Sequence, residues 1–249
     1  YGQEIRGDGP KWHNVKAGTP TMGGFVFLIS AMITAIWVGA WQNQLTASLF
    51  ILLFITLVYG ALGFLDDFIK IFRKRNMGLN SLQKLIGQIL GGLVFYFVFR
   101  SEGNADVLNF FGIDVSLSIF YGLFVIFWLV GFSNAVNLTD GIDGLVAGLG
   151  TISFSTYALI AWRQDQIDVL IVCLAIIGGL IGFFPYNRKP AKIFMGDVGS
   201  LALGGLLAAI SILLHQEWTL LLVGLVYVCE TASVMLQVAS FKLTGKRIF

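Results

Sequence analysis

The chain has 249 residues, of which 57% are hydrophobic and only 12% are charged, and its formal net charge is +2. A soluble domain carries about 25% charged residues, so half that share cannot cover a globular surface exposed to water. The composition therefore excludes an ordinary soluble protein and indicates a chain that lies in a membrane.

Eight apolar stretches are long enough to cross the roughly 30 Å hydrocarbon core of a bilayer. Because lipid cannot satisfy backbone polar groups and the stretches show no period-two alternation, we expect each to be a helix. The third and seventh are short, and we expect residues 81–84 and 198–200 to complete them. The eight predicted spans are Met22–Trp41, Ala47–Leu65, Leu85–Phe99, Val115–Phe132, Leu145–Trp162, Val169–Phe184, Leu201–Leu214 and Leu220–Ala239.

The basic residues are divided very unevenly between the two ends of these spans. With eight crossings, one face holds the N-terminal segment and residues 66–84, 133–144, 185–200 and 240–249. That face carries 14 of the 16 lysines and arginines, all except Arg100 and Arg163. The positive-inside rule predicts that this face is cytoplasmic. We expect a lipid bilayer, and no nucleic acid, as the partner of these charges, and residues 101–114 as a small surface element on the other face.

Four polar motifs lie on the predicted cytoplasmic face. The first runs from His13 to Gly24 and combines hydrogen-bond donors, a Thr-Pro pair and two glycines. On its own this motif is weak evidence for a site, because a single histidine or lysine in such a loop is more often solvated than catalytic.

The second motif places Asp66 and Asp67 at the end of an apolar run. If the helix continues there, Lys70 lies on the same face as both acids. An interfacial salt bridge is the simpler explanation, but two adjacent acids at membrane depth are costly unless they are paired or bind a metal.

The third motif is the loop from Asn134 to Leu145, which contains Asp140 and Asp143 three residues apart. One helical turn aims side chains at this spacing in the same direction, and the neighbouring glycines let a ligand approach the backbone. The alternative is a tight turn between helices with Asn and Asp caps. The absence of lysine and arginine from this loop favours a binding site.

The fourth motif runs from Asn187 to Ser200, where a basic loop leads to Asp197 at the start of an apolar helix. Asp197 fits a helix N-cap, but Phe194 and Gly196 beside it provide an aromatic ring and an open backbone, as a nucleobase site requires. Together the motifs supply carboxylates that hold Mg²⁺ and lysines that neutralise diphosphate oxygens. This mixture predicts phosphoryl transfer.

At these motifs the sequence resembles the phospho-N-acetylmuramoyl-pentapeptide transferase family of the polyprenyl-phosphate N-acetylhexosamine-1-phosphate transferases. The resemblance covers the whole chain and is most specific at residues 18–24 and 194–200. It implies an all-α, polytopic membrane helix bundle of about ten helices, of which eight are visible, with an active-site cleft that faces the cytoplasm of a bacterium. It also implies a homodimer that transfers phospho-MurNAc-pentapeptide from UDP to undecaprenyl phosphate with Mg²⁺, giving lipid I and UMP.

The resemblance assigns roles to particular residues. It implies that Asp66, Asp67 and Asp197 are catalytic acids and metal ligands. From their positions we expect Asp197 near the nucleotide and the other two near the lipid phosphate. The predicted substrate-binding residues are Lys16, Lys70, Lys84, Asn137, Asp140, Asp143, Asn187, Phe194 and Gln237.

The His-rich loop that the family carries after its ninth helix has no counterpart before Phe249. We therefore interpret residues 1–249 as a single transmembrane transferase domain that is truncated at both ends. Two alternatives stay open. One is a related transferase that uses UDP-GlcNAc, and the other is an ion-coupled transporter. Transporters place their coupling sites near the bilayer midplane, whereas these acids lie at the interface.

Overall fold

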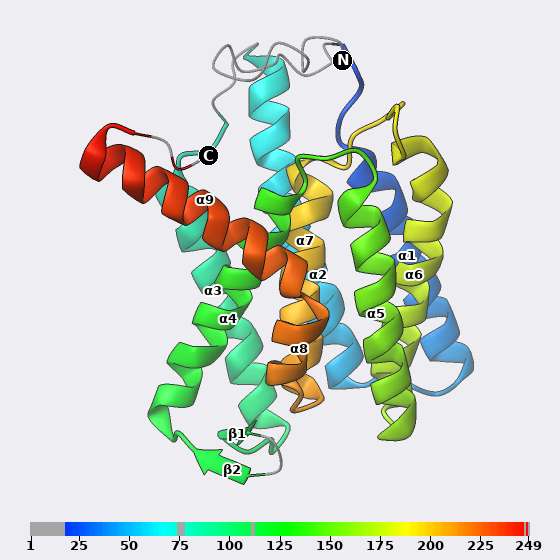
Figure 1. Ribbon diagram of the computed structural model, residues 1–249. Helices are drawn as coiled ribbons and strands as arrows, with labels where there is room; N and C mark the ends of the chain where they lie inside the picture. Colours follow the sequence, from blue (N-terminus) through cyan, green and yellow to red (C-terminus); the bar gives the residue numbers. More distant parts are fainter. Residues whose placement is uncertain (1–17, 74–77, 111–112, 247, 249) are drawn as a thin grey trace.

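The computed structural model describes residues 18–73, 78–110, 113–246 and 248, and helices dominate this part of the chain (Figure 1). Seven of the helices are long and apolar enough to cross a membrane, and an eighth span is possible if a bent pair is counted as one. The predicted polytopic helix bundle is confirmed. The helices are α1 Gly23–Trp41, α2 Ala47–Phe72, α3 Ser81–Ser101, α4 Ile119–Thr139, α5 Leu145–Arg163, α6 Ile167–Asn187, α7 Gly196–Leu213, α8 Glu217–Val223 and α9 Leu225–Thr244.

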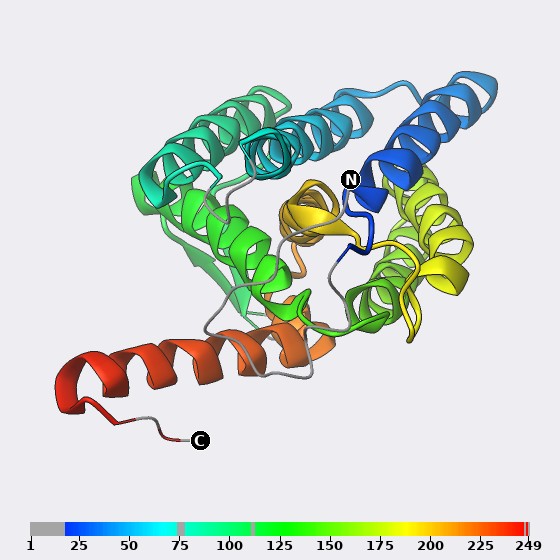
Figure 2. The same ribbon diagram turned by 90° about the horizontal axis from the view of Figure 1, so that it is seen from above.

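Helix α7 is the centre of the bundle, and the other long helices surround it (Figure 2). It packs against α1, α2, α4 and α5, and every residue from Val198 to Leu213 is buried. Small residues permit this close packing. A Cβ atom at Gly204 would lie 2.7 Å from the Cα of Ser133, and one at Gly205 would overlap the ring of Tyr59.

The start of α3 is fixed by its own sequence. The side chain of Asn80 accepts a hydrogen bond from the amide of Gln83 at 2.8 Å, and the side chain of Gln83 accepts one from the amide of Asn80 at 3.0 Å. This reciprocal capping box satisfies two amides that no helical carbonyl can reach. It also makes residues 81–84 part of the helix, as predicted, and places Lys84 in the first turn of α3.

Two of the predicted spans differ from the observed helices. The fourth does not begin at Val115, because strands β1 Val107–Phe110 and β2 Ile113–Ser116 form an antiparallel hairpin in which Leu108 pairs with Val115. Residues 101–114 are thus a surface element, as expected, but the hairpin extends beyond them.

The eighth predicted span, Leu220–Ala239, is not one helix. It divides into α8 and α9, which meet at Gly224 with a bend of 77°. A Cβ atom at Gly224 would lie 2.7 Å from the carbonyl oxygen of Leu220, so the close turn at this point requires glycine. Helix α9 then leaves the bundle at an oblique angle (Figure 1).

The loops are divided between two ends of the bundle as predicted. The α4–α5 and α6–α7 connections lie at one end, where α2 also finishes and α3 begins (Figure 1). The hairpin and the α1–α2, α5–α6 and α7–α8 connections lie at the other end. The first end therefore gathers the polar motifs of the sequence.

Candidate active site

Two buried carboxylates and a lysine share one face of α2. The helix continues to Phe72, beyond the apolar run, so Asp66 and Asp67 lie inside it, and each is only 1% exposed. Lys70 follows four and three residues later, as the spacing predicted. Its Nζ atom lies 2.5 Å from Asp66 Oδ2 and 3.6 Å from Asp67 Oδ1.

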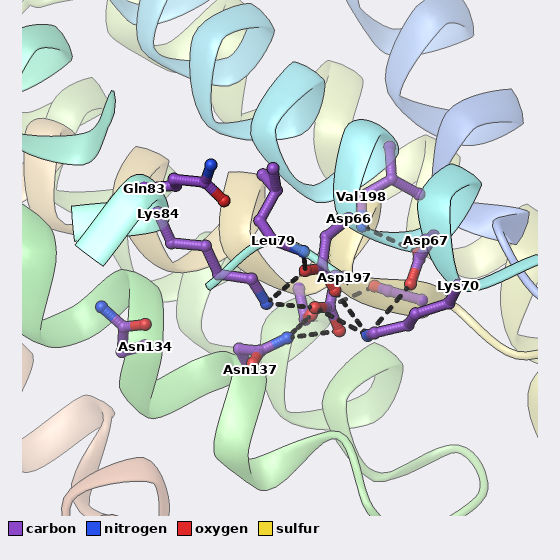
Figure 3. A network of polar contacts seen from close by, with 12 residues as sticks. Asp66, Asp67, Lys70, Leu79, Gln83, Lys84, Asn134, Asn137, Asp197 and Val198 are labelled. Carbon is purple, nitrogen blue, oxygen red and sulfur yellow. Dashed lines mark hydrogen bonds and ion pairs between the residues drawn. The ribbon is translucent and has the colours of Figure 1, made fainter. Parts of the chain in front are cut away.

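Two other helices complete the cluster (Figure 3). Asp197 lies in the first turn of α7, and its Oδ2 atom is 3.2 Å from Lys70 Nζ and 2.8 Å from Lys84 Nζ. Lys84, from α3, also lies 3.1 Å from Asp66 Oδ1. Each lysine therefore bridges acids on two different helices. All three acids therefore belong to one cluster, and the expected division between nucleotide and lipid phosphate stays a prediction.

Polar groups around the cluster hold the carboxylates in place. Asn137 of α4 donates to Asp197 Oδ1 at 3.0 Å and to the hydroxyl of Ser200 at 2.9 Å. The amide of Leu79 donates to Asp66 Oδ1 at 2.7 Å, and the amide of Val198 donates to Asp67 Oδ2 at 3.4 Å. These hydrogen bonds fix the orientation of the carboxylates, and bonds from amides to a carboxylate strengthen when it is ionised.

Two glycines allow α2 and α7 to approach closely enough for these contacts. A Cβ atom at Gly63 would overlap the carbonyl group of Asp197 and lie 2.5 Å from the amide nitrogen of Val198. Gly196 begins α7 with a φ of +77°, which favours glycine, and a Cβ there would overlap Asp67 Oδ2. Glycine at these two positions is therefore a geometric requirement of the cluster.

The three acids also have the geometry of a metal site. Each of Asp66, Asp67 and Asp197 offers a carboxylate oxygen, and the three oxygens lie within 4.8 Å of one another. An all-oxygen donor set suits a hard divalent cation such as Mg²⁺, which takes one or two carboxylates together with water and phosphate oxygens. The residues present therefore fit a bound metal ion.

The third and fourth motifs meet through Asn187, which is buried at the end of α6. Its Oδ1 atom accepts from the amide of Gly144 at 3.1 Å, and its Nδ2 atom donates to the carbonyl of Ile193 at 3.0 Å. The amide of Ala191 donates to Asp143 Oδ2 at 3.1 Å. Asn187 and Asp143 thus join the two loops, and a role in substrate binding stays a prediction for both.

Asp140 lies next to this junction, at the C-terminal end of α4, and is half-buried. Burial, together with the negative charges of Asp197, Asp67 and Asp143, raises the pKa of Asp140 well above its usual range.

The first motif pairs with the fourth along the backbone. The amide of Phe194 donates to the carbonyl of Pro20 at 2.8 Å, and the amides of Gly23 and Gly24 donate to the carbonyls of Phe194 and Met195, both at 2.9 Å. Phe194 is half-buried beside Asp197. The sequence indicated neither this pairing nor the contact of Ser200, although Ser200 follows Asp197 by one helical turn.

Lys16 and Gln237 are the remaining predicted site residues. Lys16 lies outside the described residues. Gln237 lies on α9, which begins after the bend at Gly224. A role for either in the nucleotide site stays a prediction.

The fold and the site define a class of membrane-embedded transferases. The model of glycosyl transferase family 4 matches residues 49–215, which include the three acids and both lysines of the cluster. A signature of phospho-N-acetylmuramoyl-pentapeptide-transferases matches residues 16–28.

Curated relatives match the chain along its entire length. It is 77% identical to the phospho-N-acetylmuramoyl-pentapeptide-transferase of Enterococcus hirae, 76% to that of Enterococcus faecalis and 67% to that of Latilactobacillus sakei. Each match covers 100% of this chain and 78% of the relative. The chain belongs to the phospho-N-acetylmuramoyl-pentapeptide-transferase family.

Proposed function

We propose that the chain transfers phospho-N-acetylmuramoyl-pentapeptide from its UDP carrier to undecaprenyl phosphate, giving lipid I and UMP in peptidoglycan synthesis. Membership of the family supports the reaction. The observation that carries the proposal is the cluster of three carboxylates and two lysines, Asp66, Asp67, Asp197, Lys70 and Lys84, at the end of the apolar bundle. A reaction between a water-soluble diphosphate and a lipid phosphate needs its charged groups at this level of the membrane.

The reaction exchanges one phosphoanhydride bond for another. An oxygen of the lipid phosphate forms a bond to the phosphorus that carries the sugar, and the bond from that phosphorus to the oxygen of UMP breaks. The departing oxygen keeps the electron pair, and UMP leaves. Most of the catalysis in such a transfer comes from positioning and from stabilising charge on the phosphoryl oxygens.

The residues of the cluster divide these tasks. We propose that Asp66, Asp67 and Asp197 hold Mg²⁺, which when bound draws negative charge from the phosphate oxygens. Lys70 and Lys84 lie beside the same acids and place positive charge where the diphosphate would bind. Without a divalent cation, these lysines partly neutralise three acids that are otherwise costly at the edge of the membrane.

We place the nucleotide beside the cluster, with its uracil ring on Phe194. This residue is half-buried, and it comes three residues before Asp197. Stacking on an aromatic side chain contributes about 1–3 kcal/mol per base. Asn137, Asp140, Asp143, Asn187, Lys16 and Gln237 are the further residues that we assign to the substrates.

The chain lies in the bacterial cytoplasmic membrane, and we propose that the cluster faces the cytoplasm. The basic residues support this orientation, because the order of the predicted spans along the sequence assigns 14 of the 16 to the face of the cluster. We also propose a homodimer, as the family resemblance implies. Mass measurement of the purified protein in nanodiscs tests this state directly.

A single assay tests the reaction. Purified protein is mixed with UDP-MurNAc-pentapeptide, and release of UMP is followed with and without undecaprenyl phosphate and Mg²⁺. We expect release only when all components are present. Release from UDP-GlcNAc instead would assign the chain to a different transfer reaction. No release from either sugar nucleotide would refute the proposed transferase activity.

A further inference from the structure

A second polar layer lies one helical turn below the cluster, inside the bundle. Its centre is Gln88 of α3, which follows Lys84 by four residues and is 1% exposed. Gln88 Nε2 donates to the hydroxyl of Ser133 at 3.0 Å, and Gln88 Oε1 accepts from Asn134 Nδ2 at 3.0 Å. The backbone carbonyl of Gln88 accepts from the hydroxyl of Tyr59 at 2.8 Å. Both the nitrogen and the oxygen of this side-chain amide are therefore bonded to α4.

The layer joins the same four helices that build the cluster. Tyr59 belongs to α2, Gln88 to α3, and Ser133 and Asn134 to α4. The hydroxyl of Ser133 donates to the carbonyl of Leu201 on α7 at 3.0 Å. One or two turns further along these helices lie Asp66 and Asp67, Lys84, Asn137 and Asp197, and Figure 3 shows Lys84 and Asn137 converging on Asp197.

Apolar packing alone does not require such a layer. Helices in lipid gain no hydrophobic free energy from meeting one another, and a buried glutamine is costly there unless its amide is bonded. Hydrogen bonds, however, select one axial position of a helix, whereas smooth apolar surfaces tolerate sliding. A displacement of α3 by about 1 Å is enough to separate a lysine from its carboxylates and to slow a positioned reaction up to about 100-fold.

We propose that Gln88 is a positioning residue. Its bonds to Ser133 and Asn134 fix the height of α3 against α4 and thereby hold Lys84 Nζ between Asp66 and Asp197. The kinetic part of this inference rests on the proposed function, but the geometric part does not, since it concerns only contacts within the chain.

Cross-linking without substrate tests the geometric part. In the presence of a chelator, a membrane-permeable carbodiimide joins a carboxylate to a lysine amine as an amide, and the water lost converts the carbodiimide into a urea. Mass spectrometry then compares the Lys84–Asp197 product with the Lys70–Asp66 product. The second pair lies within α2 and serves as an internal reference.

Gln88→Met removes both side-chain bonds at similar volume, and Ser133→Ala removes one of them from the α4 side. We expect each variant to lower the ratio of the two products at least threefold. The matched control is Ser211→Ala. Ser211 is also buried and accepts a hydrogen bond from Trp128 at 3.0 Å, joining α4 to α7 at the opposite end of the bundle. An unchanged ratio in Gln88→Met and Ser133→Ala, or an equal fall in the control, would overturn the proposal.

Kinetics test the consequence for transfer. We expect Gln88→Met to lower kcat about tenfold or more, with the KM for the sugar nucleotide within about threefold of wild type. In a Lys84→Met background, Gln88→Met should lower kcat less than about twofold, because the amine that Gln88 positions is absent. A full loss in that background contradicts positioning through Lys84. Wild-type protein that releases no UMP refutes the proposed function, and the cross-linking ratio still decides the geometry.

Discussion

Gly63 offers the sharpest test of how close packing builds the cluster. In Gly63→Ala, the new Cβ atom would overlap the carbonyl group of Asp197 and lie 2.5 Å from the amide nitrogen of Val198, where ordinary contacts begin near 3.4 Å. The obstacle is backbone, so no side chain can rotate away. Helices α2 and α7 must therefore separate by about 1 Å. Overpacking of this kind lowers the free energy of unfolding by about 1–3 kcal/mol. A shift of this size near a reacting group lowers the rate up to about 100-fold.

The assay is UMP release at saturating substrates, measured together with the melting temperature of the purified protein. Gly60→Ala is the matched control, because Gly60 lies one turn earlier on the same helix. A Cβ atom at Gly60 would make ordinary contacts at 3.6 and 3.7 Å. Alanine also favours the helix by about 1 kcal/mol over glycine, so this variant should be as active and as stable as wild type.

The expected result is a fall in kcat of tenfold or more for Gly63→Ala, accompanied by a lower melting temperature. Equal activities for Gly63→Ala and Gly60→Ala would refute the reasoning. In that case the separation of α2 from α7 would not control the geometry of the acids. A loss of stability with unchanged kcat would show that the helices separate without displacing Asp197.

Three further predictions address the nucleotide site, the orientation and the charge of Asp140. Phe194→Ala should raise the KM for the sugar nucleotide about tenfold in steady-state assays, and an unchanged KM would make Phe194 a packing residue. In cells, cysteine at Lys189 should react only with thiol reagents that enter the cytoplasm and cysteine at Glu102 with impermeant ones; the reverse pattern would invert the topology. The pKa of Asp140 is raised in the folded protein, so the free energy of unfolding falls as pH rises above the pKa that this carboxyl has in the unfolded chain. Asp140→Asn should therefore melt at a higher temperature than wild type at pH 7. This difference should vanish near about pH 4, and a constant difference across pH would contradict the charge explanation.

Much of the site could be predicted because its signals are local. Asp66, Asp67 and Lys70 lie within five residues, and helical periodicity alone places them on one face. The adjacency of Lys84 and Asp197 could not be derived in this way, because 113 residues separate them and only packing brings them together. The resemblance to a family supplied that information instead.

The misses have equally specific causes. The break at Gly224 was not predicted because glycine is common in membrane helices that stay straight, and nothing local distinguishes this one. The hairpin at residues 107–116 was missed in part because only two residues separate its second strand from the apolar helix α4. A role for Gln88 was not predicted, because a single glutamine in an apolar run forms no spacing pattern and its partners lie on another helix.

The central place of α7 has a consequence for how the enzyme is assembled. Membrane helices form individually before they associate, and a chain is made from its N-terminal end. The four long helices that pack against α7, namely α1, α2, α4 and α5, all precede it in the sequence, so they are present when it is synthesised, whereas the short helix α8 follows it. Helix α7 then enters a site bounded by partners already in the bilayer, and it carries Asp197 with it. The carboxylates of α2 consequently meet their third member only at this late step, so the three-acid cluster is incomplete until most of the bundle exists.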